Sequence, residues 1–234
     1  MLYIRPADER GITKTAKILS YHSFSFNRYY DQKYLAWSDL RVLNEDFVAP
    51  GGGFPTHAHN YQNILTWVLS GTLEHQDSLG NIHRLYENDM QMMYAGARVE
   101  HKEYNPSSDQ ELHFLQIWIA PNEKPEASEY HSSHIEIADY HNILRPVITS
   151  DGLNGLPIKQ DIEISIGVFD TGQSVRLPQE QRYYWAQIVS GAAVFQDQDL
   201  TQGTGLHYFG ETDVTLNITK ADTKILFFDM QIPK

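Results

Sequence analysis

The chain has 234 residues, a formal net charge of −12 at pH 7 and no cysteine. The lack of cysteine excludes disulfides, thiolate catalysis and thiolate-bound zinc, and it is typical of a reducing compartment. An acidic balance without a basic run argues against direct binding to nucleic acid or to an anionic membrane. The polar start, MLYIRPADERG, and the absence of an apolar run of about 18 residues predict a cytoplasmic protein without a signal peptide or membrane span.

Strand signals dominate the chain. Short runs rich in valine, isoleucine, leucine and aromatic residues are broken by turn signals, at 63–81, 111–121, 183–197 and 213–230. Helical periodicity is nearly absent, and many short strands with frequent turns are typical of a β-sandwich or barrel. We therefore expect an all-β chain, with one hairpin turn at DSLGN, residues 77–81.

An internal repeat indicates two related β-domains. VLSGTLEHQD at 68–77 aligns without gaps on IVSGAAVFQD at 188–197. Two weaker matches follow in the same order, QMMYAG with HYFGET and LHFLQIWI with ILFFDMQI. The polar segment 122–142 is the expected crossover, and the expected domains are residues 1–125 and 126–234.

Two histidines one residue apart, His57 and His59, follow the glycine run PGGG. In a strand, residues two apart point to the same face, so these imidazoles can share a metal ion; a solvated surface pair is the alternative. Downstream, His101 and Glu103 repeat the spacing. Three imidazoles and one carboxylate converging inside a barrel suit Fe(II), Mn(II), Ni(II), Cu(II) or Zn(II), with positions left open for water or substrate.

The second copy of the repeat lacks this ligand set. At the offsets of the aligned blocks, the four candidate ligand positions are occupied by Leu177, Gln179, Asn217 and Thr219. The sequence therefore predicts one metal ion per chain, in the N-terminal domain.

The other histidines have simpler interpretations, because exposed or hydrogen-bonded histidines are common in proteins. His75 and His83 flank the predicted hairpin turn and are expected on the surface, while His113 is expected to be half-buried and His207 structural. The crossover segment holds three histidines that are expected to be solvated loop residues: His131, His134 and His141.

Four blocks in this order resemble the pirin family of the cupin superfamily: SFSFNRYYD at 23–31, LRVLNEDFVAPGGGFPTHAH at 40–59, EHQDSLGN at 74–81 and HKEYNPS at 101–107. The resemblance covers almost the whole chain, densely up to about residue 120. It implies a bicupin, two tandem jelly-roll barrels with metal in the N-terminal barrel only. It also implies that the metal ligands are His57, His59, His101 and Glu103.

Members of the pirin family are described as quercetin 2,3-dioxygenases or as redox-sensitive transcriptional cofactors. The resemblance implies a monomer with one Fe(II) that cleaves a flavonol-type small molecule with O2, leaving a depside and carbon monoxide. Glu103 would be both a ligand and the general base. The alternative is a non-enzymatic protein whose metal oxidation state alters its binding to a regulatory partner protein.

Three positions depart from the family pattern. Ala58 stands between the first two histidines, where proline is common. Asn63 stands four residues after the second histidine, where glutamate is common, and Arg98 stands where glycine is common before the third. We expect Asn63 and Arg98 to lie near the pocket and to slow flavonol turnover or shift the substrate preference.

Overall fold

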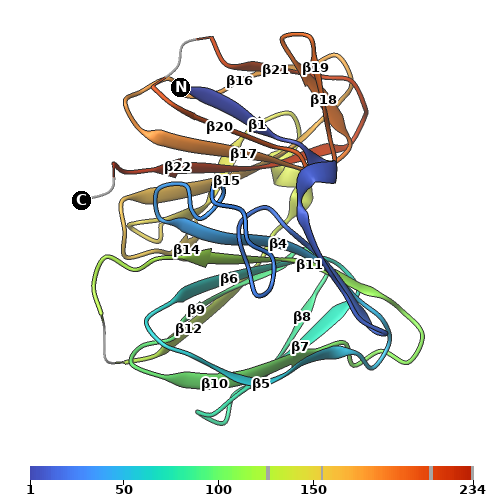
Figure 1. Cartoon of the computed structure of the whole chain (residues 1–234), viewed down its shortest axis with the longest axis vertical. Helices are drawn as coiled ribbons and strands as arrows, with labels where there is room; N and C mark the ends of the chain where they lie inside the picture. Colours follow the sequence, from blue (N-terminus) through green and yellow to red (C-terminus); the bar gives the residue numbers. More distant parts are fainter. Residues whose placement is uncertain (125–126, 154, 211–212, 233–234) are drawn as a thin grey trace. The chain divides into compact units, whose positions relative to one another are not determined.

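The computed structural model describes residues 1–124, 127–153, 155–210 and 213–232. The regular structure of these residues is nearly all strand, with two short 3-10 turns, η1 (Ala7–Glu9) and η2 (Ile137–Tyr140). None of the helices in the described part is long and apolar enough to cross a membrane. The chain divides into two compact units, one of Gly11–Ile135 and one of Met1–Arg10 with Glu136–Lys234 (Figure 1). The all-β prediction is confirmed.

The first unit is a sandwich of two sheets with the core between them. Its larger sheet has the order β12 (Glu129–His134), β9 (Asp89–Tyr94), β6 (Asn63–Ser70), β11 (Leu112–Ile119), β4 (Leu40–Val48), β3 (Ile18–His22) and β2 (Gly11–Lys14). Its smaller sheet has the order β5 (Gly53–His59), β10 (Val99–Tyr104), β7 (Thr72–Asp77) and β8 (Ile82–Tyr86). Both sheets contribute to one apolar cluster, in which Val68 and Phe114 of the larger sheet lie with Leu73 and Leu85 of the smaller one.

The burial pattern of β10 explains how polar side chains enter this unit. Along VEHKEY every second residue is buried, namely Val99, His101 and Glu103. Because side chains of a strand alternate between its faces, all three point into the sandwich. Strand β10 therefore places a histidine and a glutamate side chain in an interior that is apolar in an ordinary sandwich.

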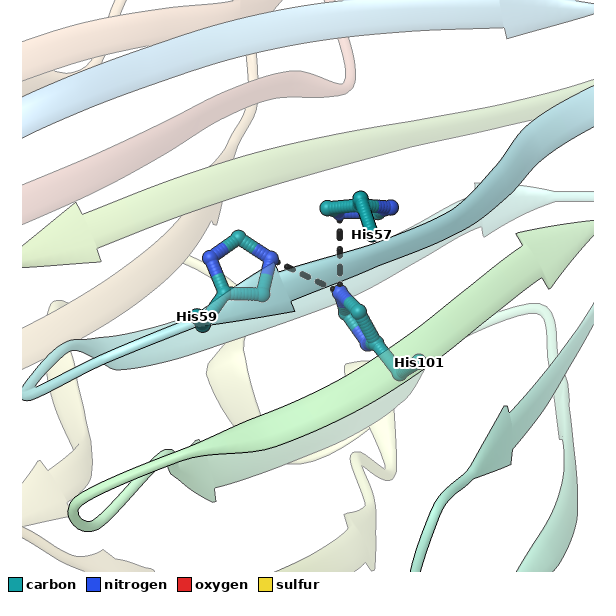
Figure 2. A group of neighbouring side chains, drawn as sticks. All are labelled: His57, His59 and His101. Atoms are coloured by element: carbon teal, nitrogen blue, oxygen red, sulfur yellow. Dashed lines mark hydrogen bonds between the residues drawn. The ribbon is translucent and has the colours of Figure 1, made fainter.

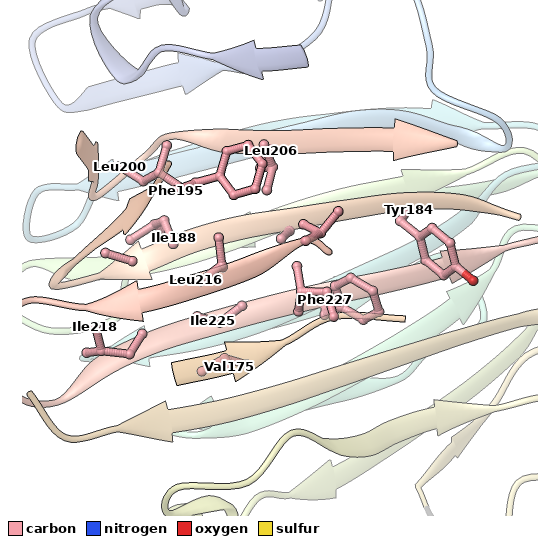
Figure 3. Close-up of a cluster of buried hydrophobic side chains, with 14 of the residues drawn as sticks. Val175, Tyr184, Ile188, Phe195, Leu200, Leu206, Leu216, Ile218, Ile225 and Phe227 are labelled. Carbon is pink, nitrogen blue, oxygen red and sulfur yellow. The ribbon is translucent and has the colours of Figure 1, made fainter. Parts of the chain in front are cut away.

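The second unit repeats the architecture. Its larger sheet has the order β1 (Leu2–Arg5), β20 (Gly205–Phe209), β17 (Tyr183–Ser190), β22 (Thr223–Met230), β15 (Ile162–Phe169), β13 (Arg145–Thr149) and β14 (Leu156–Pro157). Its smaller sheet has the order β16 (Ser174–Arg176), β21 (Thr215–Ile218), β18 (Ala192–Phe195) and β19 (Gln198–Thr201). A large cluster of buried apolar side chains, among them Ile188, Leu216 and Phe227, fills its interior (Figure 3).

The strand orders confirm the internal repeat. Strands β9, β6, β11 and β4 lie in the same order as β20, β17, β22 and β15. The aligned Ser-Gly pairs form the same turn in both copies, since Gly71 and Gly191 have φ of +82° and +81°. Positive φ at this value is a conformation that glycine adopts without steric cost, which explains why the residue recurs.

The observed units differ from the expected ranges 1–125 and 126–234 because edge strands pair across long sequence distances. Strand β12 pairs with β9, with Glu129 opposite Tyr94, so the first unit continues to Ile135. Strand β1 pairs with β20, so the first ten residues belong to the second unit. The expectation of loop histidines is wrong for two of the three, because His131 and His134 lie on β12.

Candidate metal centre

Three histidines converge from two neighbouring strands of the first unit (Figure 2). Strands β5 and β10 are antiparallel, and His57 lies directly opposite His101. The His101 Nε2 atom is 3.1 Å from His57 Nε2 and 2.8 Å from His59 Nε2. His59 and His101 are buried, and His57 is half-buried. The strand pairing therefore brings the three imidazoles together, and their role as metal ligands stays a prediction.

The spacing of these nitrogens fits ligation of a single ion. Metal–imidazole bonds are about 2.0–2.1 Å long, so two ligands at right angles have nitrogens about 3.0 Å apart, and two tetrahedral ligands about 3.4 Å apart. The two separations that involve His101, 2.8 and 3.1 Å, lie nearer the right-angle value. These separations are compatible with ligation of one ion by His101 together with His57 and His59.

The electrostatic setting keeps the imidazoles of His59 and His101 neutral, the form that binds metal. Burial lowers the pKa of His59 to about 3, and the neighbouring imidazoles of His101 and His57 lower it further. Burial likewise lowers the pKa of His101 to about 3, with His57 and His75 acting in the same direction. Lone pairs on Nε2 are thus present across the physiological pH range.

Hydrogen bonds to the opposite ring nitrogens orient two of the rings. Nδ1 of His57 lies 2.8 Å from the carbonyl oxygen of Pro55, so it donates there and Nε2 carries the lone pair. Nδ1 of His101 lies 3.3 Å from Nδ1 of His75. Metal-binding histidines generally have such a partner on the second nitrogen, which fixes the tautomer and the ring orientation.

Glu103 lies beside this group but is not part of the three-histidine cluster. Its carboxylate forms a second group with His75 and His101, whose possible ligand atoms all lie within 4.8 Å of one another. Two amides hold it: Gln91 Nε2 donates to Oε1 at 3.0 Å, and Gln116 Nε2 donates to Oε2 at 2.7 Å. These two hydrogen bonds fix the orientation of both carboxylate oxygens.

A cavity of about 550 Å³ opens onto His57 and Glu103. Its apolar lining comes from Ile18, Phe26, Phe54 and Trp118, and its polar lining includes Ser20, His22, Asn44, Asp46 and Gln116. This volume falls in the roughly 300–1,000 Å³ range of small-molecule sites, which combine apolar walls with a few placed polar groups. A drug-sized, largely apolar ligand can therefore enter beside the candidate ligands.

Asp46 is a second buried carboxyl group in this cavity that the sequence motifs did not reveal. Burial raises the pKa of Asp46 to about 7, opposed by the hydrogen bond from Ser20 and assisted by the charges of Glu103 and Glu45. Asp46 lies on β4, at the end of a run from Val42 to Asp46 in which every residue is buried. Strand β4 therefore carries no period-2 signal that would identify Asp46 as a cavity residue.

His75 lies in the interior, so the expectation of a surface residue is wrong. Its exposed fraction is 0%, and on β7 it lies opposite Glu103 of β10. His83 is half-buried, with its ring stacked on Tyr130 at a centroid distance of 4.1 Å. The hairpin turn at 77–81 is present, but the strand pairing that leads into it points His75 toward His101.

Two other histidine expectations are confirmed. His113 is half-buried, stacked on Phe47 and 3.0 Å from a Glu45 carboxylate oxygen. His207 is buried between the rings of Tyr3 and Trp185 in the second unit, in keeping with a structural role.

The two family departures do not line the cavity, contrary to expectation. Arg98 is exposed, and its guanidinium pairs with Glu100 at 2.6 Å. Asn63 is buried at the start of β6, and it is not among the described residues that line the cavity. The structure therefore does not support a direct effect of either side chain on which substrate the cavity accepts.

Strand pairing in the second unit shows what occupies the equivalent positions. The backbone N–H of Leu177 donates to the carbonyl oxygen of Val214 at 2.9 Å, which matches the pairing of His57 with His101. In the repeat, Val194 is the counterpart of Glu74. Val194 pairs with Asn217, and Glu74 pairs with Tyr104, so Asn217 corresponds to Tyr104. The expected counterparts of His101 and Glu103 thus require correction.

The corrected counterparts are apolar. They are Val214 and Leu216, in place of Asn217 and Thr219. Leu177, Val214 and Leu216 are all buried in the apolar cluster of Figure 3, which labels Leu216. These positions offer no donor atom to a metal ion.

Comparison with known proteins agrees with this organisation. The Pirin family model matches residues 5–119, and a model described as the quercetinase C-terminal cupin domain matches residues 147–230. A quercetin 2,3-dioxygenase of Escherichia coli strain K12 is 36% identical over 232 residues, which cover 98% of this chain and 99% of that protein. The chain belongs to the pirin family.

This pirin is also similar to solved structures over its whole chain. The crystal structure of YhhW from Escherichia coli superposes with a TM-score of 0.92 at 33% identity, covering 100% of both chains. The same bacterial pirin in complex with nickel(II) superposes with a TM-score of 0.91 at 34% identity, again over 100% of both chains. The bicupin prediction is confirmed, and a divalent metal in a pirin of this shape has a precedent.

Proposed function

We propose that this pirin is a metal-dependent dioxygenase that cleaves a flavonol-type substrate with O2 and releases carbon monoxide. The observation that carries the proposal is the convergence of His57, His59 and His101 at the wall of a ligand-sized cavity that Glu103 also lines. The name quercetin 2,3-dioxygenase of the Escherichia coli relative supports the same reaction class.

The cavity suits a flat polyphenol. Phe26, Phe54 and Trp118 provide aromatic surface against which planar rings can stack. Asn44 and His22 provide polar atoms for substrate hydroxyl groups, and His22 Nδ1 is already 2.8 Å from Asn44 Oδ1. A planar molecule with peripheral hydroxyls would match both kinds of surface.

One divalent ion per chain, which we propose to be Fe(II), would be held by the three imidazoles and Glu103. When bound, it would supply Lewis acidity and orient the reactants. The neutral imidazoles and the amide-held carboxylate are suited to an ion of this charge. The second unit would hold none, because the counterparts of His57, His101 and Glu103 are the apolar residues Leu177, Val214 and Leu216.

Glu103 has a second role in this proposal, as the acceptor of the proton of the flavonol 3-hydroxyl. Its carboxylate lines the cavity, and Gln91 and Gln116 keep its two oxygens in fixed positions. The reaction then balances without a further reductant or oxidant: both atoms of O2 enter the depside, and one ring carbon leaves as carbon monoxide.

The test is aerobic incubation of the Fe(II)-loaded protein with quercetin. Loss of the flavonol's visible absorbance with stoichiometric carbon monoxide supports the enzyme, and the metal-free protein and the His57→Ala variant are the controls. Full metal occupancy with no flavonol loss above the controls would overturn the proposal. In that case, oxidation-dependent binding to a partner protein becomes the function to test.

A further inference from the structure

A chain of three buried side chains leads away from the candidate metal centre. His101 Nδ1 lies 3.3 Å from His75 Nδ1, and His75 Nε2 lies 3.4 Å from Asp77 Oδ2. His75 is 0% and His101 1% exposed, and the side chain of Asp77 is 2% exposed. Burial excludes competing water, so each group depends on the next one for its hydrogen bond.

The chemistry of the end groups fixes the direction of every hydrogen in this chain. His101 presents Nε2 toward the other candidate ligands, so its proton is on Nδ1 and is donated to His75 Nδ1. Because His75 Nδ1 accepts in this bond, the ring proton of His75 lies on Nε2, which faces Asp77. An ionised carboxylate only accepts, so Asp77 selects this arrangement over its reverse.

Asp77 is itself held rigidly by the hairpin turn. Its Oδ1 accepts the backbone N–H groups of Leu79 at 2.9 Å and Asn81 at 3.0 Å, and its Oδ2 accepts Asn81 Nδ2 at 2.8 Å. The turn between β7 and β8 thereby fixes the carboxylate that faces His75. A local turn motif and the metal centre are connected through two side chains.

We propose that Asp77 and His75 are positioning residues, which fix the tautomer and ring orientation of His101 and strengthen its bond to the metal. The inference rests on the metal site of the proposed function but does not depend on flavonol cleavage. Loss of a partner of this kind typically weakens metal binding about 10–100-fold.

The alternative is that a second metal ion binds between His75, His101 and Glu103. These residues lie within 4.8 Å of one another, which is also compatible with shared ligation. That arrangement would need the lone pair of His101 Nδ1, whereas the positioning role needs its proton. The two readings therefore predict opposite protonation of one nitrogen atom.

The repeat supplies a substitution that the strand geometry accommodates. At the aligned position of the second unit stands Phe195, which is buried in the apolar cluster (Figure 3). His75→Phe therefore keeps a ring of similar shape and removes both hydrogen bonds. His75→Asn restores an acceptor near Nδ1, and His83→Phe is a matched control, because His83 stacks on Tyr130 and lies in neither candidate ligand group.

The first measurement is long-range ¹H–¹⁵N correlation spectroscopy on the zinc-loaded wild type, which distinguishes protonated from unprotonated ring nitrogens. We expect a proton on His101 Nδ1 and on His75 Nε2, and none on His75 Nδ1. A proton on His75 Nδ1, or two tightly bound zinc equivalents per chain, would overturn the inference.

The second measurement is Ni(II) affinity in competition with a chelator. We expect His75→Phe to bind about 10–100-fold more weakly than wild type, His75→Asn to recover part of that loss, and His83→Phe to match wild type. If His75→Phe does not fold, Asp77→Asn takes its place and should weaken binding in the same direction. Affinities of the folded variants within twofold of wild type would refute the positioning role, whether or not the protein cleaves flavonols.

Discussion

Replacing Glu103 with glutamine separates its proposed role as a proton acceptor from simple retention of the metal. The amide has nearly the same shape but cannot accept the proton of a flavonol hydroxyl. Because three histidine ligands remain, we expect the variant to keep substantial metal. Removal of a general base costs about 10²–10⁴-fold in rate, so flavonol cleavage should fall by that factor at neutral pH.

The structure also sets the stability cost of this substitution. Both oxygens of Glu103 accept amide hydrogens, from Gln91 and Gln116, so the new NH2 group of Glu103→Gln must face one of these donors. Gln91 cannot simply flip, because its Oε1 accepts the Tyr130 hydroxyl at 3.0 Å. A buried polar group left without its partner costs about 1–3 kcal/mol, which the midpoint of urea unfolding should reveal.

The assay compares Fe(II)-loaded wild type, Glu103→Gln and Glu45→Gln at equal metal content. Glu45 is a buried carboxylate that pairs with His113 and does not line the cavity, so its variant should retain cleavage. Activity of Glu103→Gln should rise with pH as the flavonol 3-hydroxyl ionises without help. A metal-loaded Glu103→Gln that cleaves at the wild-type rate would show that Glu103 is not the base.

Three further outcomes follow from single residues. Metal analysis should find one equivalent per chain, and His57→Ala should lower the occupancy sharply, because it removes one of the converging imidazoles. Arg98→Gly should leave flavonol turnover within about twofold of wild type, since Arg98 is exposed and pairs with Glu100, and surface changes of this kind have small effects. Burial, assisted by the charge of Arg5, lowers the pKa of His207 from 6.5 to about 4, so the unfolded chain binds more protons between these pH values and stability falls as pH falls through them. Between pH 7 and pH 4, the unfolding free energy of the wild type should therefore fall by about 3 kcal/mol more than that of His207→Phe. Urea titrations of both proteins at the two pH values measure this difference.

The side chains proposed as metal ligands could be found in the sequence because strand geometry converts sequence spacing directly into side-chain direction. A skip of one residue places His57 with His59, and His101 with Glu103, on one face each, and only the pairing of the two strands remained to be found. The observed register places His101 opposite His57. The repeat was visible for a related reason, since the Ser-Gly turn requires positive φ at Gly71 and Gly191 in both copies.

The features that escaped prediction depend on pairings between distant segments. Strand β1 completes the second unit and β12 the first, because each pairs along an edge far from it in sequence. His75 stands close to a turn, which favours exposure, but its neighbour across the sheet is Glu103 of β10. Local sequence describes the turn correctly and carries no information on which strand lies beside it.

The two copies of the repeat show which polar groups the candidate metal centre buries in this fold. Where the second unit buries Phe195, Val214 and Leu216 in its apolar cluster, the first buries His75, His101 and Glu103 at the same positions. Burying such groups is unfavourable unless each has a partner. The amides of Gln91 and Gln116 donate to Glu103, and the Asp77 carboxylate accepts from His75. The Nε2 atom of His101 remains 2.8 and 3.1 Å from those of His59 and His57, and a bound cation would stabilise the folded unit by an amount that grows with the logarithm of its concentration relative to its Kd. The first unit therefore has a thermodynamic reason to depend on metal that the second, with its apolar interior, does not share.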